Sequence, residues 1–120
     1  MSESSRVRGA LGEVRAEQVL LDRGYEILAR NAVCPGAEID LIARDGNVIV
    51  FAEVKMRSGR FAAGREAVTT AKQKRICKGA LYYMMKNGLM NRQARFDVIE
   101  IQGGRVTHIV DAFPYQGPAF

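Results

Sequence analysis

The sequence predicts an α/β domain in the order helix, three strands, helix, two strands. Three observations carry this prediction. Apolar residues recur at helical spacing in two segments, they alternate or cluster over strand-like lengths in five others, and turn residues separate the segments. The chain has 120 residues, of which 48% are hydrophobic and 26% charged, and this suits one domain spanning 1–120 with one core.

The first helix is expected over 11–23, where apolar residues fall close to helical spacing and Gly24 follows as a stop signal. A short strand over 25–30 comes next. A loop over 31–37 contains a Pro-Gly turn. We expect residues 1–8 and 114–120 to be flexible tails.

A hairpin is expected over 38–56. Its strands cover 38–43 and 48–56, and Asp45-Gly46 between them is a strong turn signal. The residues that would share one apolar face are Ile39, Leu41, Ala43, Val48, Val50, Ala52 and Val54. The opposite face begins with Ile42, Ile49 and Phe51 and then becomes charged.

The remaining elements are a helix and two strands. The helix is expected over 71–86, with Thr69 or Thr70 as its N-cap and Asn-Gly at its end. The strands are expected over 94–101 and 105–110, with Gly-Gly as their turn.

Acidic residues gather at one end of the predicted hairpin. With the turn centred as above, Glu38 pairs with Glu53, and Asp40 lies diagonally from Glu53 at about 7–8 Å. Lys55 is the one base beside them. Like charges that face each other destabilise a sheet, so this cluster needs a physical reason.

A divalent cation would supply that reason. Mg²⁺ takes one or two carboxylates together with water and phosphate oxygens, and it can polarise a phosphoryl group and activate water. Lys55 would add positive charge where the transition state becomes more negative. The alternative is a solvated polar end of a hairpin in which Lys55 offsets Glu53, and a bulge would change the pairing.

Polar residues also interrupt the apolar stripes of both predicted helices. Glu13 does so in the first helix, and burying a lone carboxylate is costly unless a partner or a metal meets it. Gln73 does so in the second helix. The bases around it are Lys72, Lys74, Arg75 and Lys78. This helix end either contacts phosphate or is an ordinary solvated face.

The net charge of +5 favours a polyanionic partner. Arg57 and Arg60 follow the second hairpin strand and either contact phosphate or face solvent. His108 is the single histidine, and we interpret it as structural, so a Ser/His or Cys/His hydrolase has little support. Two distant cysteines, no signal-like segment and short apolar runs favour a cytoplasmic protein without a membrane partner.

Six segments carry a resemblance to a known family. They are GEVRAE (12–17), GYEILARN (24–31), AEIDLIA (37–43), VFAEVKMR (50–57), EAV (66–68) and RFDVIEI (95–101). Together they resemble the small bacterial YraN family, which is grouped with Holliday-junction-resolvase-like and restriction-endonuclease-like nucleases. The resemblance covers roughly residues 9–113.

The resemblance implies a restriction-endonuclease-like α/β/α sandwich with a mixed central sheet. It also implies a nuclease that uses Mg²⁺ or Mn²⁺ to hydrolyse DNA phosphodiesters, with branched DNA as an open option. A homodimer is a further option, since a single small domain offers one site and a junction needs two cuts. Asp40, Glu53 and Lys55 would form its signature, and Glu13 would assist. The hairpin and the resemblance together predict that the metal ligands are drawn from Asp40, Glu53, Glu13, Glu38 and the Val54 carbonyl.

Two departures concern substrate contacts. Ala37 stands where the family usually has Gly, and Val33 and Cys34 occupy a loop where a basic residue is common. Two other functions stay open. One is a catalytically silent nucleic-acid-binding module on the same fold, and the other is a protein-interaction subunit with no nucleic-acid role.

Overall fold

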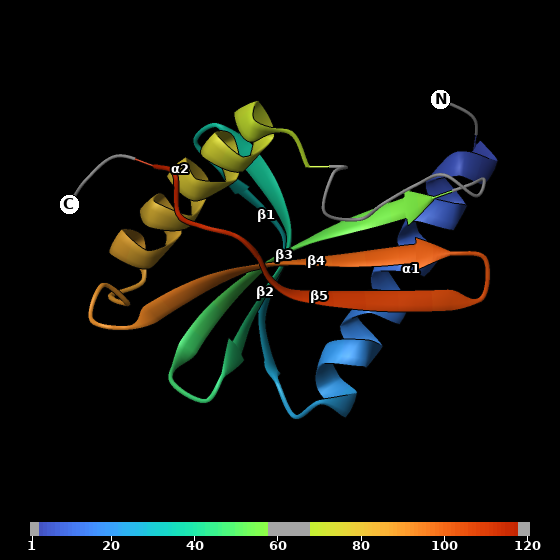
Figure 1. Cartoon of the computed structure of the whole chain (residues 1–120), viewed down its shortest axis with the longest axis horizontal. Helices are drawn as coiled ribbons and strands as arrows, with labels where there is room; N and C mark the ends of the chain where they lie inside the picture. Colours follow the sequence, from blue (N-terminus) through green and yellow to red (C-terminus); the bar gives the residue numbers. More distant parts are fainter. Residues whose placement is uncertain (1–2, 58–67, 118–120) are drawn as a thin grey trace.

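A five-stranded mixed sheet separates two helices in the computed structural model of the chain (Figure 1). The structure describes residues 3–57 and 68–117, and their side chains from residue 11 onward. The elements are α1 (Glu3–Asp22), β1 (Glu26–Cys34), β2 (Ala37–Asp45), β3 (Val48–Arg57), α2 (Thr70–Lys86), β4 (Gln93–Gln102) and β5 (Arg105–Phe113). The predicted order of elements and the α/β fold are confirmed.

The observed elements are longer than expected. The helix α1 begins at Glu3, so residues 3–8 are helical and do not form an irregular tail. Strand β1 continues to Cys34, which turns most of the loop predicted over 31–37 into strand. Residues 114–117 are irregular, but they are held in place, because the Gln116 backbone N–H donates to Cys77 Sγ at 3.2 Å.

The order of strands in the sheet follows the order of strands in the chain. The pairs β1–β2, β2–β3 and β4–β5 are antiparallel, and β3–β4 is parallel. A parallel pair needs a crossover, and α2 lies in the connection that supplies it.

The predicted register of the β2–β3 hairpin is wrong by two residues. Arg44 pairs with Ile49 and Asp45 with Val48, so the turn residues are Gly46 and Asn47 and not Asp45 and Gly46. Gly46 has φ +59°, and a two-residue turn with a positive φ at its first position is typically led by glycine. A shift of two residues leaves side chains on their predicted faces, because strand side chains alternate with period two.

Both faces of the sheet are packed. On the α1 side, the buried residues are Ala16, Leu20, Leu41, Ala43, Val50, Ala52, Ile99 and Ile101. On the α2 side, they include Ile39, Ile42, Ile49, Phe51, Ile76, Ala80, Phe96 and Val98. Ile39 was predicted on the same face as Leu41 and instead packs beneath α2. The alternation of β2 therefore breaks at Asp40, between them.

Helix α2 begins at a side-chain cap and lies close to the β1–β2 hairpin. Thr69 Oγ1 accepts the Lys72 backbone N–H at 3.2 Å, as expected for an N-cap. At Gly79 an added Cβ would lie 3.1 Å from Cys34 Cβ and 3.5 Å from Ile39 Cδ1. The absence of a side chain at Gly79 thus allows α2 to approach the sheet closely.

Candidate functional site

Asp40 lies where β2 and β3 separate. The last pair of their ladder is Leu41–Ala52. One residue further on, the Asp40 Oδ2 atom accepts the backbone N–H of Val54 at 2.8 Å. Backbone N–H groups of a strand point along the plane of the sheet, so this carboxylate occupies the gap between the two strands.

Negative charge accumulates around Asp40. The pKa of Asp40 is raised to about 6, mainly by burial and then by the negative charges of Glu53 and of Glu13 on α1. The Val54 N–H and Lys72 act in the opposite direction. Asp40 and Glu53 therefore share one electrostatic environment, and the carboxyl group of Asp40 is short of positive charge.

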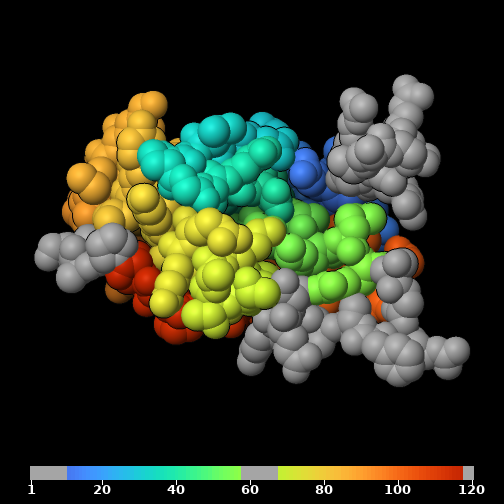
Figure 2. All heavy atoms as spheres, turned by 90° about the horizontal axis from the view of Figure 1, so that it is seen from above, coloured from blue at the N-terminus to red at the C-terminus, as the bar shows by residue number. Residues whose placement is uncertain are grey.

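Glu53 is buried beside two lysines. It follows Ile49 and Phe51 on the α2 side of β3 and is 6% exposed. Its Oε1 atom lies 2.6 Å from Lys72 Nζ and 3.4 Å from Lys55 Nζ. Lys72 comes from the first turn of α2, which packs beside β3 (Figure 2, yellow-green against green).

The two lysines respond differently to this contact. Burial and the hydrogen bond with Lys72 lower the pKa of Lys55, although Glu53 opposes the shift. Burial also disfavours the charge of Lys72, but its hydrogen bonds to Glu53 and Lys55 raise its pKa overall. Lys72 is therefore the cation that neutralises Glu53 most firmly.

The donor chemistry fits Mg²⁺ or Mn²⁺. Carboxylates of Asp40 and Glu53 and the nearby backbone of Val54 offer hard oxygen atoms, and the raised pKa of Asp40 marks a place that favours added positive charge. Within residues 3–57 and 68–117, no group of three or more His, Cys, Asp or Glu residues is arranged to hold a metal. The site thus offers two carboxylates, and water and phosphate would complete the coordination of an ion.

The predicted pair between Glu38 and Glu53 is wrong. Glu38 is exposed and pairs with Val33 of β1, because the observed register moves it away from Glu53. Glu13 is half-buried on α1, and its negative charge raises the pKa of Asp40.

The predicted phosphate-binding residues are divided among several environments. Lys74 and Arg75 are exposed on α2, whereas Lys72 points to Glu53. Arg57 Nε is 3.8 Å from Glu100 Oε2 at the end of the same sheet face. Arg60 lies outside the described residues.

Gln73 is engaged in contacts within the protein. Its Nε2 donates to the Val68 carbonyl at 2.8 Å, and its Oε1 accepts from Gln116 Nε2. These bonds tie the start of α2 to the C-terminal segment. They account for a polar residue at this position without a substrate.

Sequence reasoning missed Glu100. It pairs with Lys55 in the parallel β3–β4 ladder, and its side chain is 12% exposed. The signal was present in the alternation of Phe96, Val98 and Glu100, which places all three on the α2 side of β4.

A second buried charged cluster lies on the α1 side of the sheet. Asp97 is fully buried and accepts hydrogen bonds from Arg95 at 2.9 and 3.1 Å, from His108 Nε2 at 2.7 Å and from the Asp111 backbone N–H at 2.9 Å. Burial alone would raise the pKa of Asp97, but the bonds from His108 and Arg95 lower it overall. Arg95 and Asp97 therefore form a direct ion pair.

The same contacts define the state of His108. Arg23 contacts His108 Nδ1 at 2.7 Å, and a guanidinium can only donate. Nδ1 is therefore the acceptor, and Nε2 carries the proton that is donated to Asp97. This is the structural histidine expected from the sequence, and its two ring nitrogens are both engaged.

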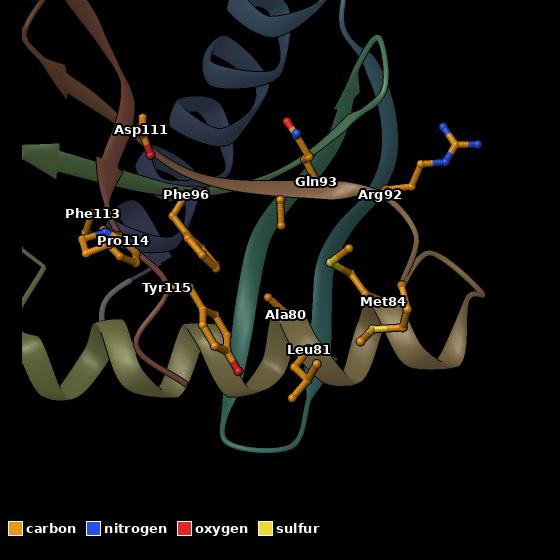
Figure 3. Close-up of a pocket in the computed structure, with 12 residues that line it drawn as sticks. Ala80, Leu81, Met84, Arg92, Gln93, Phe96, Asp111, Phe113, Pro114 and Tyr115 are labelled. Atoms are coloured by element: carbon orange, nitrogen blue, oxygen red, sulfur yellow. The ribbon is translucent and has the colours of Figure 1, made fainter. Parts of the chain in front are cut away.

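A pocket of about 410 Å³ lies between the second half of α2 and the start of β4 (Figure 3). Its lining is mainly apolar and includes Met84, Phe96, Phe113 and Tyr115. None of the predicted site residues lines this pocket. The acidic cluster is therefore a separate feature of the molecule.

Comparisons with known proteins address the family. A sequence model of the uncharacterised protein family UPF0102 matches residues 12–101, a range that contains Glu13, Asp40, Glu53, Lys55 and Lys72. A UPF0102 protein from Geobacter metallireducens is 44% identical over 118 residues, covering 94% of this chain and 97% of the relative. Another from Symbiobacterium thermophilum is 46% identical over 101 residues, covering 83% of this chain and 86% of the relative. Across the described part of the chain, neither helix has the length and apolar character needed to cross a membrane.

Proposed function

Because the chain belongs to the uncharacterised protein family UPF0102, the YraN family named above, and carries the acidic cluster of β2 and β3, we propose that it is a metal-dependent nuclease for DNA phosphodiesters. The observation that carries the proposal is the environment of Asp40. A half-buried carboxylate next to a second buried carboxylate is costly unless a cation meets it.

Each residue has a distinct role in this proposal. Asp40 and Glu53 would hold Mg²⁺ or Mn²⁺ together with the Val54 carbonyl, and Glu13 would add negative charge from α1. A bound ion would polarise the phosphoryl group and lower the pKa of the attacking water. The Lys55 ammonium, 3.4 Å from Glu53 Oε1, would donate to that water or to a phosphate oxygen.

Contacts outside the acidic cluster would position the nucleic acid. Lys74 and Arg75 are exposed on the same helix that brings Lys72 to the site. Such residues bind phosphate without reading bases, so we propose recognition of backbone shape, with branched DNA as one substrate to be tested. A homodimer would supply two such sites for a four-way junction.

The test is an endonuclease assay on linear, flapped and four-way DNA with Mg²⁺, Mn²⁺ or a chelator. We expect cutting that needs the metal and that is lost in Asp40→Asn and Glu53→Gln proteins. Glu38→Gln is the matched control, because this exposed acid lies on β2 away from Glu53, and it should cut normally. Cutting that survives both site substitutions would refute the proposal.

One observation favours a second candidate function, a silent nucleic-acid-binding module. Glu53 is already neutralised by Lys72, so this carboxylate is stable without a metal. Salt-dependent binding of DNA without cutting, by the intact protein and on every substrate, would favour this second function. No salt-dependent binding at all would favour a protein-interaction subunit.

A further inference from the structure

Lys72 occupies the position of the cation that the site is proposed to bind. Its Nζ lies 2.6 Å from Glu53 Oε1, and its charge also lowers the pKa of Asp40. It therefore acts on both carboxylates of the proposed metal site. A divalent ion bound to the same Glu53 oxygen would repel this ammonium, because two cations a few ångströms apart in a partly buried site interact unfavourably.

We propose that Lys72 is an exchangeable counter-ion: it neutralises Glu53 while metal is absent, leaves when metal binds, and then contacts a phosphate of the nucleic acid. This inference rests on the proposed function of the Asp40–Glu53 site. It assigns Lys72 a positioning role that couples metal binding to phosphate binding.

The surroundings of Lys72 permit this exchange. Its side chain is 34% exposed, whereas that of Glu53 is 7% exposed and that of Lys55 is 22% exposed. The ammonium of Lys72 can therefore move toward solvent more easily than its partners can. Lys55 remains near Glu53 on the same strand.

The destination of the released ammonium is the start of α2. Lys72 lies in the first helical turn, which has no acidic residue, and the exposed Lys74 and Arg75 follow it. The positive end of the helix dipole and these side chains favour a phosphate group there. A phosphate bound to the metal would lie within reach of the same lysine.

The exchange makes metal and nucleic acid bind cooperatively. A bound metal ion releases the Lys72 ammonium from Glu53, and the ammonium can then contact a phosphate. Coupling between two ligands is reciprocal, so bound nucleic acid should also strengthen metal binding. Removing the ammonium should therefore strengthen metal binding in the absence of nucleic acid. It should also weaken the increase in nucleic-acid affinity that the metal produces.

The experiment measures binding and not cleavage. Titration calorimetry with Mn²⁺ compares the intact protein with Lys72→Met, Lys72→Arg and Lys74→Met proteins. We expect Lys72→Met to bind Mn²⁺ about tenfold more tightly, because the competing charge is gone. Lys74→Met should match the intact protein, and Lys72→Arg should restore weaker binding.

A second titration uses a labelled DNA duplex with Ca²⁺ or with a chelator. Fluorescence anisotropy measures the affinity of each protein for DNA with and without Ca²⁺. The increase in affinity that Ca²⁺ produces should be at least about threefold larger for the intact protein than for the Lys72→Met protein. Lys74→Met should weaken DNA binding equally with and without Ca²⁺. An equal Ca²⁺ effect in the intact and Lys72→Met proteins would overturn the coupling.

Direct observation of the lysine ammonium in the unaltered protein makes the test independent of variant folding. The protons of the Lys72 ammonium, observed through its ¹⁵N signal, should be protected from exchange with water while the ammonium is bound to Glu53. This protection from exchange should be lost when Mg²⁺ is added. A Lys72 signal that stays protected at saturating Mg²⁺ overturns the role of Lys72 alone. Failure of every protein to bind Mn²⁺ or Mg²⁺ overturns the metal site as well, so the two failures are distinguishable.

Discussion

Asp40→Asn should make the metal-free protein more stable at neutral pH. The substitution removes a half-buried charge that burial and Glu53 disfavour, and the Asn oxygen can still accept the Val54 N–H. The carboxylate of Asp40, which we propose as a metal ligand, would then lower the free energy of unfolding of the metal-free protein. Stability and function oppose each other at this residue.

The magnitude follows from the pKa of Asp40. Its pKa rises from 3.8 to about 6 on folding. Each unit of pKa difference corresponds to about 1.4 kcal/mol, so the gain in the free energy of unfolding is at most about 3 kcal/mol. Partial exposure of the residue reduces this, and we expect about 1–3 kcal/mol. Because the folded-state pKa lies above the unfolded value, the penalty is absent below about pH 4 and grows as pH rises toward 6.

Urea denaturation at pH 4.0, 5.0 and 7.5 measures this effect. The free energy of unfolding of Asp40→Asn should match that of the unaltered protein at pH 4.0 and exceed it at pH 7.5. Glu38→Gln is the control, since an exposed acid on the same strand should give no such difference. At one hundred times its Kd, Mg²⁺ should stabilise the unaltered protein by about 2.7 kcal/mol and the variant by less.

Two results would refute the reasoning. One is an Asp40→Asn protein that is less stable than the unaltered protein at pH 7.5. The other is a gain in stability that is equal at pH 4.0 and 7.5, because that would show that the charge of Asp40 is not its cause.

Three further predictions concern packing and buried groups. Gly79→Val should lower the free energy of unfolding by about 1–3 kcal/mol, because a Cβ there lies 3.1 Å from Cys34 Cβ; an equal loss in Gly104→Val, where nothing lies within 4 Å, would contradict this. Asp97→Ala should cost about 3–5 kcal/mol in urea denaturation, because it removes the buried acceptor that Arg95, His108 and the Asp111 N–H share, and a loss near zero would refute that role. Burial raises the thiol pKa of Cys34 and Cys77, so Ellman's reagent should label both only on unfolding; rapid labelling of the folded protein would be the contrary result.

The order of the elements was predictable because periodicity is a local property. Helical spacing around Ala16 and Leu20 and alternation in β2 and β3 both follow from residues close in sequence. The exact register was not, since Asp45-Gly46 and Gly46-Asn47 are both acceptable hairpin turns. From Leu41 to Val54 the faces survived the error because the shift was an even number of residues, whereas Ile39 changed face at the break in alternation.

The candidate site was predictable in part for the same reason. Alternation placed Asp40, Glu53 and Lys55 at one end of the hairpin. The contact between Lys72 and Glu53 could not be predicted, because it depends on where the crossover brings the start of α2 relative to β3. The side-chain bond from Asp40 to Val54 also escaped prediction, since it forms only where the two strands stop pairing.

The agreement between strand order and chain order has a consequence for folding kinetics. The three N-terminal strands and the C-terminal hairpin can each form from neighbouring residues, and only the pairing of β3 with β4 must close a long connection. The entropic cost of loop closure is therefore concentrated in one step, which should limit the refolding rate. Phe51 and Phe96 stack across this junction with ring centroids 5.7 Å apart, so truncating either should slow refolding more than it accelerates unfolding.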